Sequence, residues 1–512
     1  MSESPFQSVL TPEDARLVVE GGEPPYFRDL NLDQVVARIV RGYEEYELGA
    51  IFRTRLSRTD DVLYRQEVFS DLEVDETRAH VVAFAGAMRT MRRQLAQVEQ
   101  RYYARERQGW FLLVAATYAE AVTRLDSALA PIELGSRGMR GLRDHLHAHV
   151  ESAEFKRLAA DIASVTGALA AIRFAVNIKG PRVTITRFAE DEDYGAAIVR
   201  TFERFRQGKV AEQSSGVQSW PENSHVSAQI LDRVARFHSD AFVALDEFCT
   251  RHRQFSDALI GTFDCEVQFY IAYLAHCSQL QEAGLRFCHP RVSSRAKTTL
   301  VRDAFDMALA QKLVAEGAPV VTNDIKLDGP ERAIVVSGPN QGGKTTFARM
   351  FGQLHHLAAI GCPVPGTRAQ LMLCDRLFTH FERQENIATL AGKLEEELQR
   401  VHAILEQAGG RSVVVMNESF SSTSLHDAFV IGRAVIGQLV ESDLLCVYVT
   451  FIDELSRLSP ATVSMVSSID VADPATRTFK ILRRPADGLA YAAALAAKYR
   501  LGSDQVGERL RG

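Results

Sequence analysis

The sequence predicts an elongated, all-helical domain followed by an α/β domain with a mostly parallel sheet. Between about residues 32 and 285, apolar residues recur at steps of three and four, which places them on one face of a helix. After about residue 287, short β-branched runs at 333–336, 412–416, 444–450 and 478–482 alternate with helical stretches, as in a parallel sheet covered by helices. A glycine-rich run at 338–346 directly follows one β-branched run. Together these observations predict an α + α/β chain.

The helical domain is expected over residues 59–286, after an N-terminal segment, 1–58, that is expected to be partly disordered and then helical. Apolar residues from Leu231 to Phe263 form a stripe that suits one long helix or two consecutive helices. A β-like run, RVTITR at 182–187, interrupts the helices. The polar segment 207–224 predicts a loop, either a plain surface loop or a functional one.

Composition and charge limit the functions that the chain can have. The chain has 512 residues with a formal net charge of −6, so any contact with nucleic acid must come from local basic patches. Its seven cysteines show no metal-binding spacing, which favours reduced thiols. The N-terminus lacks the pattern of a signal peptide, and no apolar run approaches the ~20 residues that span a bilayer. We therefore expect a cytoplasmic protein with no membrane partner.

The run GPNQGGKTT at residues 338–346 matches the phosphate-binding loop pattern at every fixed position. It lies between the β-branched run at 333–336 and a helix predicted over 345–360. Backbone N–H groups of such a loop surround a phosphate, and the helix N-terminus adds the positive end of its dipole. Lys344 can reach the β- and γ-phosphates, and Thr345 can bind Mg²⁺. The expected cofactors are ATP and Mg²⁺, held by Gly338, Pro339, Asn340, Gln341, Gly342, Gly343, Lys344, Thr345 and Thr346.

A second apolar run, SVVVM at 412–416, ends in Asn417 and Glu418. Such a strand brings the residues after it to the carboxyl edge of the sheet, beside the phosphates. Glu418 is therefore the candidate general base. Asn417 occupies the position that usually carries the aspartate holding Mg²⁺ through water. Because an amide adds no negative charge, we expect weaker Mg²⁺ binding. The alternative is an unrelated strand end.

Several ordered motifs make the C-terminal region resemble the ATPase domain of the MutS family of mismatch-repair proteins, an ABC-type ATPase. They are VVTND at 320–324 with the glycine-rich loop, CPVP at 362–365, DRLFT at 375–379, the run from Asn417 to Asp427, and PADGLAYA at 485–492. The resemblance implies that residues 287–512 form a MutS-like P-loop ATPase domain and that Asn323 contributes to the nucleotide site. It also implies a homodimer with nucleotide sites between the ATPase domains. A weaker resemblance to the MutS core and lever rests on RQEVFSDL at 65–72 and on the helix layout.

Four departures from the MutS pattern predict a reduced member without mismatch recognition. Only about 60 residues precede the helical region, too few for the mismatch-reading and connector domains, and they contain no Phe-x-Glu wedge. The segment 207–224 is shorter than the usual DNA clamp. Asn417 replaces an aspartate, and Phe451 replaces the family's switch histidine and cannot hydrogen-bond a phosphate or a water.

The motif LAGKL at 390–394, which includes Gly392 and Lys393, opens a helix predicted over 394–405. In ABC-type dimers the corresponding helix N-terminus reaches the partner's γ-phosphate. The Gly392 N–H and the Lys393 ammonium both suit an anion, so Lys393 is a candidate γ-phosphate sensor in trans. The alternative is a solvent-facing helix cap.

Arginines and two tyrosines cluster between residues 89 and 107, on what the sequence predicts to be one helix. The alternatives are a stripe that lies on DNA phosphates and a solvated face whose arginines pair with acids elsewhere. The DNA candidates are Arg89, Arg93, Arg101 and Arg105.

The favoured interpretation is a homodimeric, slowly hydrolysing ATPase whose helical arms engage double-stranded or branched DNA, which would associate it with the nucleoid. A second interpretation is a nucleotide-gated scaffold that binds ATP without useful hydrolysis and does not bind DNA. A small-molecule kinase fits poorly, because the helical half offers no evident acceptor site.

Overall fold

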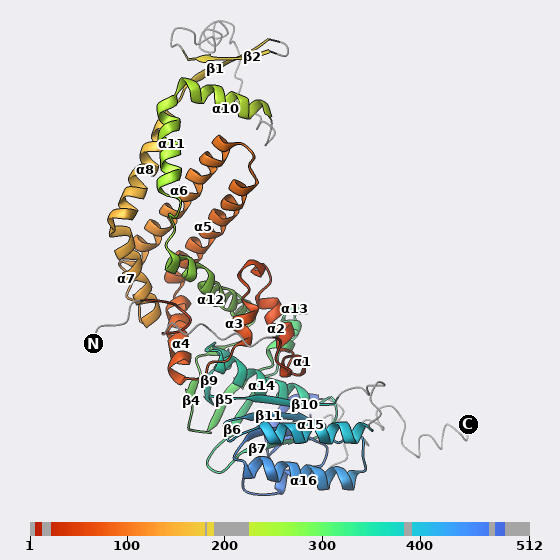
Figure 1. Ribbon diagram of the computed structural model, residues 1–512. Coiled ribbons are helices and arrows are strands. Elements are labelled where there is room, and N and C mark those ends of the chain that lie inside the picture. The colour runs from red at the N-terminus through yellow and green to blue at the C-terminus, as the bar shows by residue number, and fades with distance from the viewer. Residues whose placement is uncertain are drawn as a thin grey trace, which may run out of the picture. The chain divides into compact units, whose positions relative to one another are not determined.

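A computed structural model describes two compact units of the chain (Figure 1). The sheet unit comprises Met1–Asp75, Leu134–Arg140 and Cys265–Gly512, and the helical unit comprises Glu76–Glu133 and Gly141–Asp264. These units interleave along the chain. The domains expected from the sequence, by contrast, follow one another in chain order, and their boundaries remain a prediction. The residues described are 6–12, 22–179, 182–188, 225–382, 392–469 and 477–486.

The helical unit is formed by long helices and one hairpin. Its buried residues include Tyr118, Phe155 and Phe248, which pack between the helices. The antiparallel hairpin confirms the β-like run predicted at 182–187. The predicted loop at 207–224 lies outside the described residues. The elements of this unit are α5 (Asp75–Gln100), α6 (Ala104–Leu129), α7 (Arg137–Glu151), α8 (Ala153–Ala170), β1 (Phe174–Lys179), β2 (Arg182–Arg187), α10 (His225–Phe237), α11 (Ser239–Arg251) and the first part of α12 (Ala258–Glu282).

The apolar stripe from Leu231 to Phe263 crosses three helices, not the one or two that its spacing predicts. The first break is at His238, whose backbone leaves the helical region with φ −124° and ψ 48°. The second break ends at Asp257, whose side chain accepts a hydrogen bond from Ile260 N at 2.9 Å and so caps α12. Neither break contains glycine or proline, which explains why periodicity alone does not locate them.

The sheet unit is built on a six-stranded sheet in the order β10-β11-β12-β7-β13-β14. The first five strands are parallel and β14 is antiparallel to β13, which confirms the predicted mostly parallel sheet. Every residue of β7, β11 and β12 is buried, which accounts for their β-branched composition. The strands are β7 (Ala333–Ser337), β10 (Leu377–Phe381), β11 (Val413–Asn417), β12 (Leu445–Val449), β13 (Thr462–Ile469) and β14 (Arg477–Arg483).

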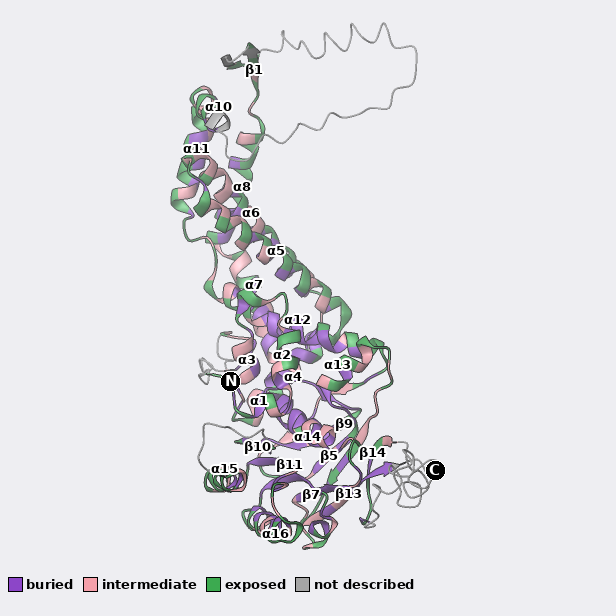
Figure 2. Ribbon diagram, turned by 90° about the vertical axis from the view of Figure 1, so that its right-hand side faces the viewer, coloured by how far each residue is buried: buried purple, intermediate pink, exposed green. Residues whose placement is uncertain are grey.

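Helices cover both faces of this sheet. Figure 1 shows α14 (Lys344–Ala359) on one face and α15 (Lys393–Gln407) and α16 (Leu425–Glu441) on the other. Side chains of α15 and α16, including Val401 and Ile436, pack against Val335, Val414 and Tyr448 of the strands. Figure 2 shows the strands buried and the outward faces of α15 and α16 exposed. The helices predicted over 345–360 and 394–405 are therefore present.

Smaller elements complete the sheet unit. A second sheet has the order β4-β9-β5-β6, and β3 pairs with β8. Within the described ranges, no helix has both the length and the hydropathy needed to cross a membrane. These elements are α1 (Tyr26–Asp29), α2 (Leu32–Ile39), α3 (Gly49–Arg53), α4 (Thr59–Glu73), β3 (Phe287–Cys288), β4 (Arg291–Ser293), β5 (Thr299–Ala304), α13 (Met307–Ala315), β6 (Asn323–Leu327), β8 (Val364–Pro365) and β9 (Arg368–Met372).

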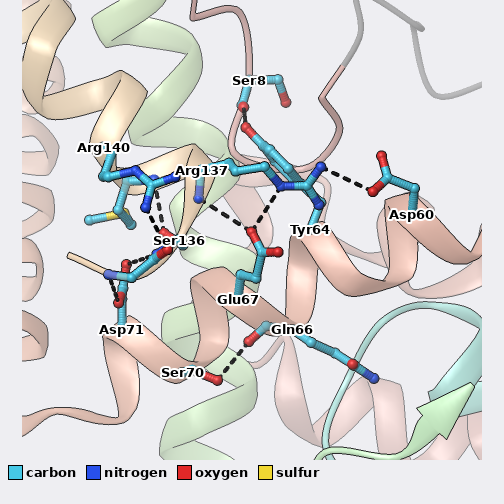
Figure 3. Close-up of polar contacts among 12 residues, drawn as sticks. Ser8, Asp60, Tyr64, Gln66, Glu67, Ser70, Asp71, Ser136, Arg137 and Arg140 are labelled. Atoms are coloured by element: carbon cyan, nitrogen blue, oxygen red, sulfur yellow. Dashed lines mark hydrogen bonds and ion pairs between the residues drawn. The ribbon is translucent and has the colours of Figure 1, made fainter. Parts of the chain in front are cut away.

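The motif RQEVFSDL on α4 ties together distant parts of the sheet unit. Arg65 is fully buried and donates to Leu10 O at 3.0 Å and to Ile360 O at 2.9 Å. Figure 3 shows further contacts of α4, among them the pairing of Glu67 with Arg137 at 3.0 Å. In the same view Asp71 accepts from the N–H groups of residues 135 and 136, each at 2.9 Å. The polar residues of this motif therefore hold the base of α7 and the end of α14.

Candidate functional site

The glycine-rich loop joins the carboxyl end of β7 to the N-terminus of α14. Gly343 has a φ of +89°, a conformation that a residue with a side chain rarely adopts. At Gly342 a Cβ atom would come within 2.2 Å of Ser467 Oγ, and this hydroxyl donates to Gly342 O at 2.7 Å. The loop is therefore fixed against β13, and only glycine fits at position 342.

Lys344 turns its ammonium group back into the loop. Its Nζ donates to Gly338 O at 2.8 Å, to Pro339 O at 3.2 Å and to Asn340 Oδ1 at 3.2 Å. Burial lowers the pKa of Lys344, while the nearby Glu418 carboxylate opposes this shift. A buried cation that is surrounded by neutral oxygens is well suited to meet an incoming anion.

The ends of three parallel strands meet beside this loop. Thr345 Oγ1 donates to Asn417 Oδ1 at 2.9 Å, which joins the start of α14 to the end of β11. In the sheet, β12 lies between β11 and β7. Two hydrogen bonds join the ends of these strands, because Glu418 N donates to Val449 O and Thr450 N donates to Val336 O, each at 3.0 Å. The structure thus brings Lys344, Thr345, Asn417 and Glu418 to one edge of the sheet.

The segment after β11 is held in an unusual backbone conformation. Glu418 and Phe420 have φ values of 51° and 63°, in the left-handed region that non-glycine residues rarely occupy. Phe420 N donates to Glu397 Oε2 at 2.8 Å, and Ser419 Oγ lies 2.7 Å from His380 Nδ1. These contacts from α15 and β10 fix the direction in which Glu418 leaves the strand.

Glu397 and His380 are site residues that the sequence does not reveal. Glu397 belongs to the acidic first turn of α15, where three consecutive glutamates suggest a solvated helix start. It is buried, however, and burial raises the pKa of its carboxyl group, with the Phe420 N–H opposing that shift. Helical periodicity could have singled out Glu397, because it lies four residues before the buried Val401 on the same face.

Asn323 lies on β6, and its amide is used by the edge strand β14. Its Oδ1 accepts from Ile481 N at 2.7 Å, and its Nδ2 donates to Phe479 O at 3.2 Å. Phe479 in turn packs near Gly343, since a Cβ on that glycine would lie 3.6 Å from Phe479 O. Asn323 therefore positions β14 next to the loop.

Lys393 is the first residue of α15 and forms an ion pair within its own subunit. Its Nζ lies 2.6 Å from Glu382 Oε1, and this contact lowers the pKa of the Glu382 carboxyl group. Gly392 occupies the N-cap position without a side-chain cap. Residues 390 and 391 of the predicted motif lie outside the described residues.

The single helix predicted for the arginine cluster is wrong. Helix α5 ends at Gln100 and α6 begins at Ala104, with an extended Tyr103 (ψ 132°) between them. Arg89 and Arg93 lie on α5, so this pair does share a helix, whereas Arg101 and Arg105 do not.

Arg101 and Arg105 both lie against aromatic rings of the helical unit. Arg101 is buried with its guanidinium 5.2 Å from the centre of the Trp110 ring. The guanidinium of Arg105 lies 5.5 Å from the centre of the Phe242 ring. Both arginines contribute to the packing of the helical unit, so the four residues do not form one continuous stripe.

Comparisons with known proteins agree with the geometry of the sheet edge. Residues 334–492, which include the loop, Asn417 and Glu418, match the family model of MutS domain V. Similar relatives include the DNA mismatch repair protein msh3 of Botryotinia fuckeliana, 27% identical over 44% of this chain and 21% of the relative. The DNA mismatch repair protein MutS of Erythrobacter litoralis is 32% identical over 35% of this chain and 20% of the relative. The DNA mismatch repair protein MutS of Chloroflexus aurantiacus is 38% identical over 23% of this chain and 12% of the relative.

The chain thus spans 21% or less of the length of these three relatives. The matched family model covers the loop and the strand ends described above. Over this C-terminal region, residues 334–492, the chain is therefore MutS-like.

Proposed function

We propose that the chain binds ATP with Mg²⁺ at the edge of the sheet and hydrolyses it slowly. The observation that carries this proposal is the convergence of Lys344, Thr345, Asn417 and Glu418, with Thr345 Oγ1 2.9 Å from Asn417 Oδ1. Lys344 would bind the phosphates, together with the loop from Gly338 to Thr346. Asn323 would support the loop through β14.

The residues present fit a magnesium nucleotide. The loop glycines let the backbone pack closely against Ser467, and the polar groups at the site comprise an ammonium, a hydroxyl, a carboxamide and a carboxylate. Thr345 would bind Mg²⁺ directly and Asn417 through water. The ion would neutralise the charge that develops on the phosphate oxygens.

Glu418 is the proposed general base, and its half-buried carboxylate is directed by the fixed segment at 418–420. Two features favour slow turnover. Asn417 supplies no negative charge to the metal site, and Phe451, which is 51% exposed, cannot hydrogen-bond a phosphate or a water.

The nucleotide sites would lie between two copies of the chain. Exposed apolar side chains gather on the elements that carry the site, which favours cover by a second subunit. Leu425 at the start of α16 is 63% exposed, and Phe479 beside the loop is 48% exposed. A homodimer would bury these side chains.

For the helical unit we propose binding of double-stranded or branched DNA, without mismatch recognition. The proposal rests on the relatives, which are named DNA mismatch repair proteins. Arg89 and Arg93 on α5 remain the candidates for contact with phosphates. The alternative is a scaffold that binds ATP without useful hydrolysis and does not bind DNA. The engagement of Arg101 and Arg105 in packing favours that alternative.

ATP turnover by Glu418→Gln separates these two functions. We expect the variant to bind ATP normally but to lose at least about 100-fold in turnover, because the general base is removed. The control is Glu441→Gln, an exposed glutamate at the end of α16 that should change neither quantity. Turnover that DNA stimulates, and that loses this stimulation steeply as salt rises, would support coupling to DNA. Tight ATP binding without Glu418-dependent turnover would support the scaffold.

The proposed trans contact of Lys393 is tested by two opposite substitutions. Lys393→Ala should weaken ATP-dependent dimerisation, measured by analytical ultracentrifugation with and without ATP. Glu382→Gln removes the carboxylate that pairs with Lys393 at 2.6 Å, so it should leave dimerisation intact or strengthen it. If Lys393→Ala dimerises with ATP as the wild type does, the lysine is only a helix cap.

A further inference from the structure

A pocket lies in the sheet unit, lined by residues of α2, of the turn after it, of the later part of α12 and of α13. Its volume is about 690 Å³, within the range of sites that bind small molecules. Neither the loop at 338–346 nor the strand-end residues Asn417 and Glu418 line it. The pocket is therefore separate from the proposed nucleotide site.

Two arginines give this pocket a positive charge. Arg38 on α2 and Arg41 just after it are exposed and line the pocket, and no aspartate or glutamate lines it. In the described part of the chain, neither arginine forms an ion pair or a side-chain hydrogen bond. Two guanidinium groups without acidic partners favour an anion, because their planar forks match carboxylate and phosphate oxygens.

The inner wall of the pocket is polar but uncharged. His276 on α12 and Gln311 on α13 are both buried, and their Nε2 atoms lie 2.6 Å apart. Because an amide nitrogen only donates, the imidazole Nε2 accepts and its proton resides on Nδ1. Burial lowers the pKa of His276 to about 4, assisted by Arg38, so this ring is neutral at pH 7. The wall therefore adds no negative charge that would oppose an anion.

The remaining lining is apolar or aromatic. Ala272 and Leu280 of α12 and Val314 of α13 form apolar walls, and the ring of Tyr43 also lines the pocket. A bare inorganic ion would use the arginines but leave these surfaces without a partner. An occupant with an apolar or aromatic body uses both halves of the pocket.

We propose that this pocket binds a small organic anion, with its phosphate or carboxylate on Arg38 and Arg41 and its apolar or aromatic body between α12 and α13. This is a site in addition to the phosphate-binding loop and does not depend on the function proposed for that loop.

Calorimetric titration of the full chain at low salt tests this site. The probes are adenosine monophosphate, benzoate and inorganic phosphate, which separate a phosphate ester from a carboxylate and from a bare ion. The protein carries Lys344→Ala, so that binding at the loop does not contribute. We expect one of the two organic probes to bind more tightly than inorganic phosphate.

Two variants locate the binding. Arg38→Gln with Arg41→Gln should weaken it at least about tenfold, because charge-assisted hydrogen bonds are lost. Ala275→Trp should block it without changing charge, since Ala275 is an exposed residue of the lining. The matched control is Arg295→Gln, an exposed arginine outside the pocket. Circular dichroism verifies that each variant is folded.

Three results would overturn the proposal. They are no binding of either organic probe at millimolar concentration, binding that the Arg38 and Arg41 substitutions leave unchanged, and inorganic phosphate binding at least as tightly as both organic probes. Loss of ATP turnover in Glu418→Gln does not bear on this site, so the two proposals fail independently.

Discussion

Replacing Arg65 by methionine is expected to lower the free energy of unfolding of the sheet unit by about 3 kcal/mol. Arg65 is fully buried, and its two hydrogen bonds to Leu10 O and Ile360 O would be lost. Its guanidinium also lies 5.3 Å from the centre of the Phe269 ring. Each carbonyl oxygen would remain buried without this donor, a penalty that methionine cannot relieve.

One effect of Arg65→Met opposes this loss of stability but does not cancel it. Burial lowers the pKa of Arg65, so its removal relieves an unfavourable desolvation. Burial, however, raises the pKa of the nearby Glu266 carboxyl group, and Arg65 opposes that shift, a compensation that disappears with the arginine. The net expectation is therefore destabilisation. Urea unfolding, monitored by circular dichroism, measures this change in the free energy of unfolding. The control is Arg291→Met at an exposed position, which should change the free energy of unfolding by no more than about 0.5 kcal/mol. A loss below 1 kcal/mol for Arg65→Met would contradict the account.

Arg65 also illustrates what a sequence motif can and cannot reveal. The run RQEVFSDL can be noticed in the sequence, but its contacts involve residues 10 and 360, far apart in the chain. Ile360 directly follows α14, the helix that begins at Lys344. Only the fold shows that this arginine supports the end of the helix that leads from the candidate site.

The strands and helices nearest the site are those that the sequence predicts best. Apolar β-branched runs at 333–336, 412–416 and 444–450 correspond to β7, β11 and β12, because a strand buried on both faces must be apolar throughout. Strand order does not follow from these runs, since β12 lies between β11 and β7 in the sheet although it is the last of the three along the chain. β13 escapes prediction, because four of its eight residues are serine or threonine.

The charged residues were harder to predict than the glycines. The glycine-rich loop is recognisable because its backbone conformation requires specific residues at specific positions. A glutamate or an arginine, by contrast, can be solvated or buried. Glu397 is buried against Phe420 N and Arg101 against Trp110, although both belong to charged stretches of the sequence. Tertiary packing decides between these outcomes. Helical spacing points to burial for Glu397, but no pattern in the sequence does so for Arg101.

Replacing Lys344 by methionine should reduce the affinity for ATP at least about 100-fold, a loss near 3 kcal/mol. Methionine has a similar length but cannot donate to a phosphate. Without nucleotide, the same substitution should leave the protein as stable as the wild type or more stable. The reason is that Lys344 is a buried ammonium whose hydrogen bonds only partly offset its desolvation.

The pH dependence of stability gives a second measurement on Lys344. Burial lowers its pKa in the folded protein below the ordinary value of 10.5, so the unfolded state binds more protons between the two values. The stability of the wild type should therefore rise with pH through that window relative to Lys344→Met. Lys326→Met, an exposed lysine on β6, is the matched control for charge. If Lys344→Met keeps ATP affinity within about threefold of the wild type, the loop at 338–346 does not hold the phosphates.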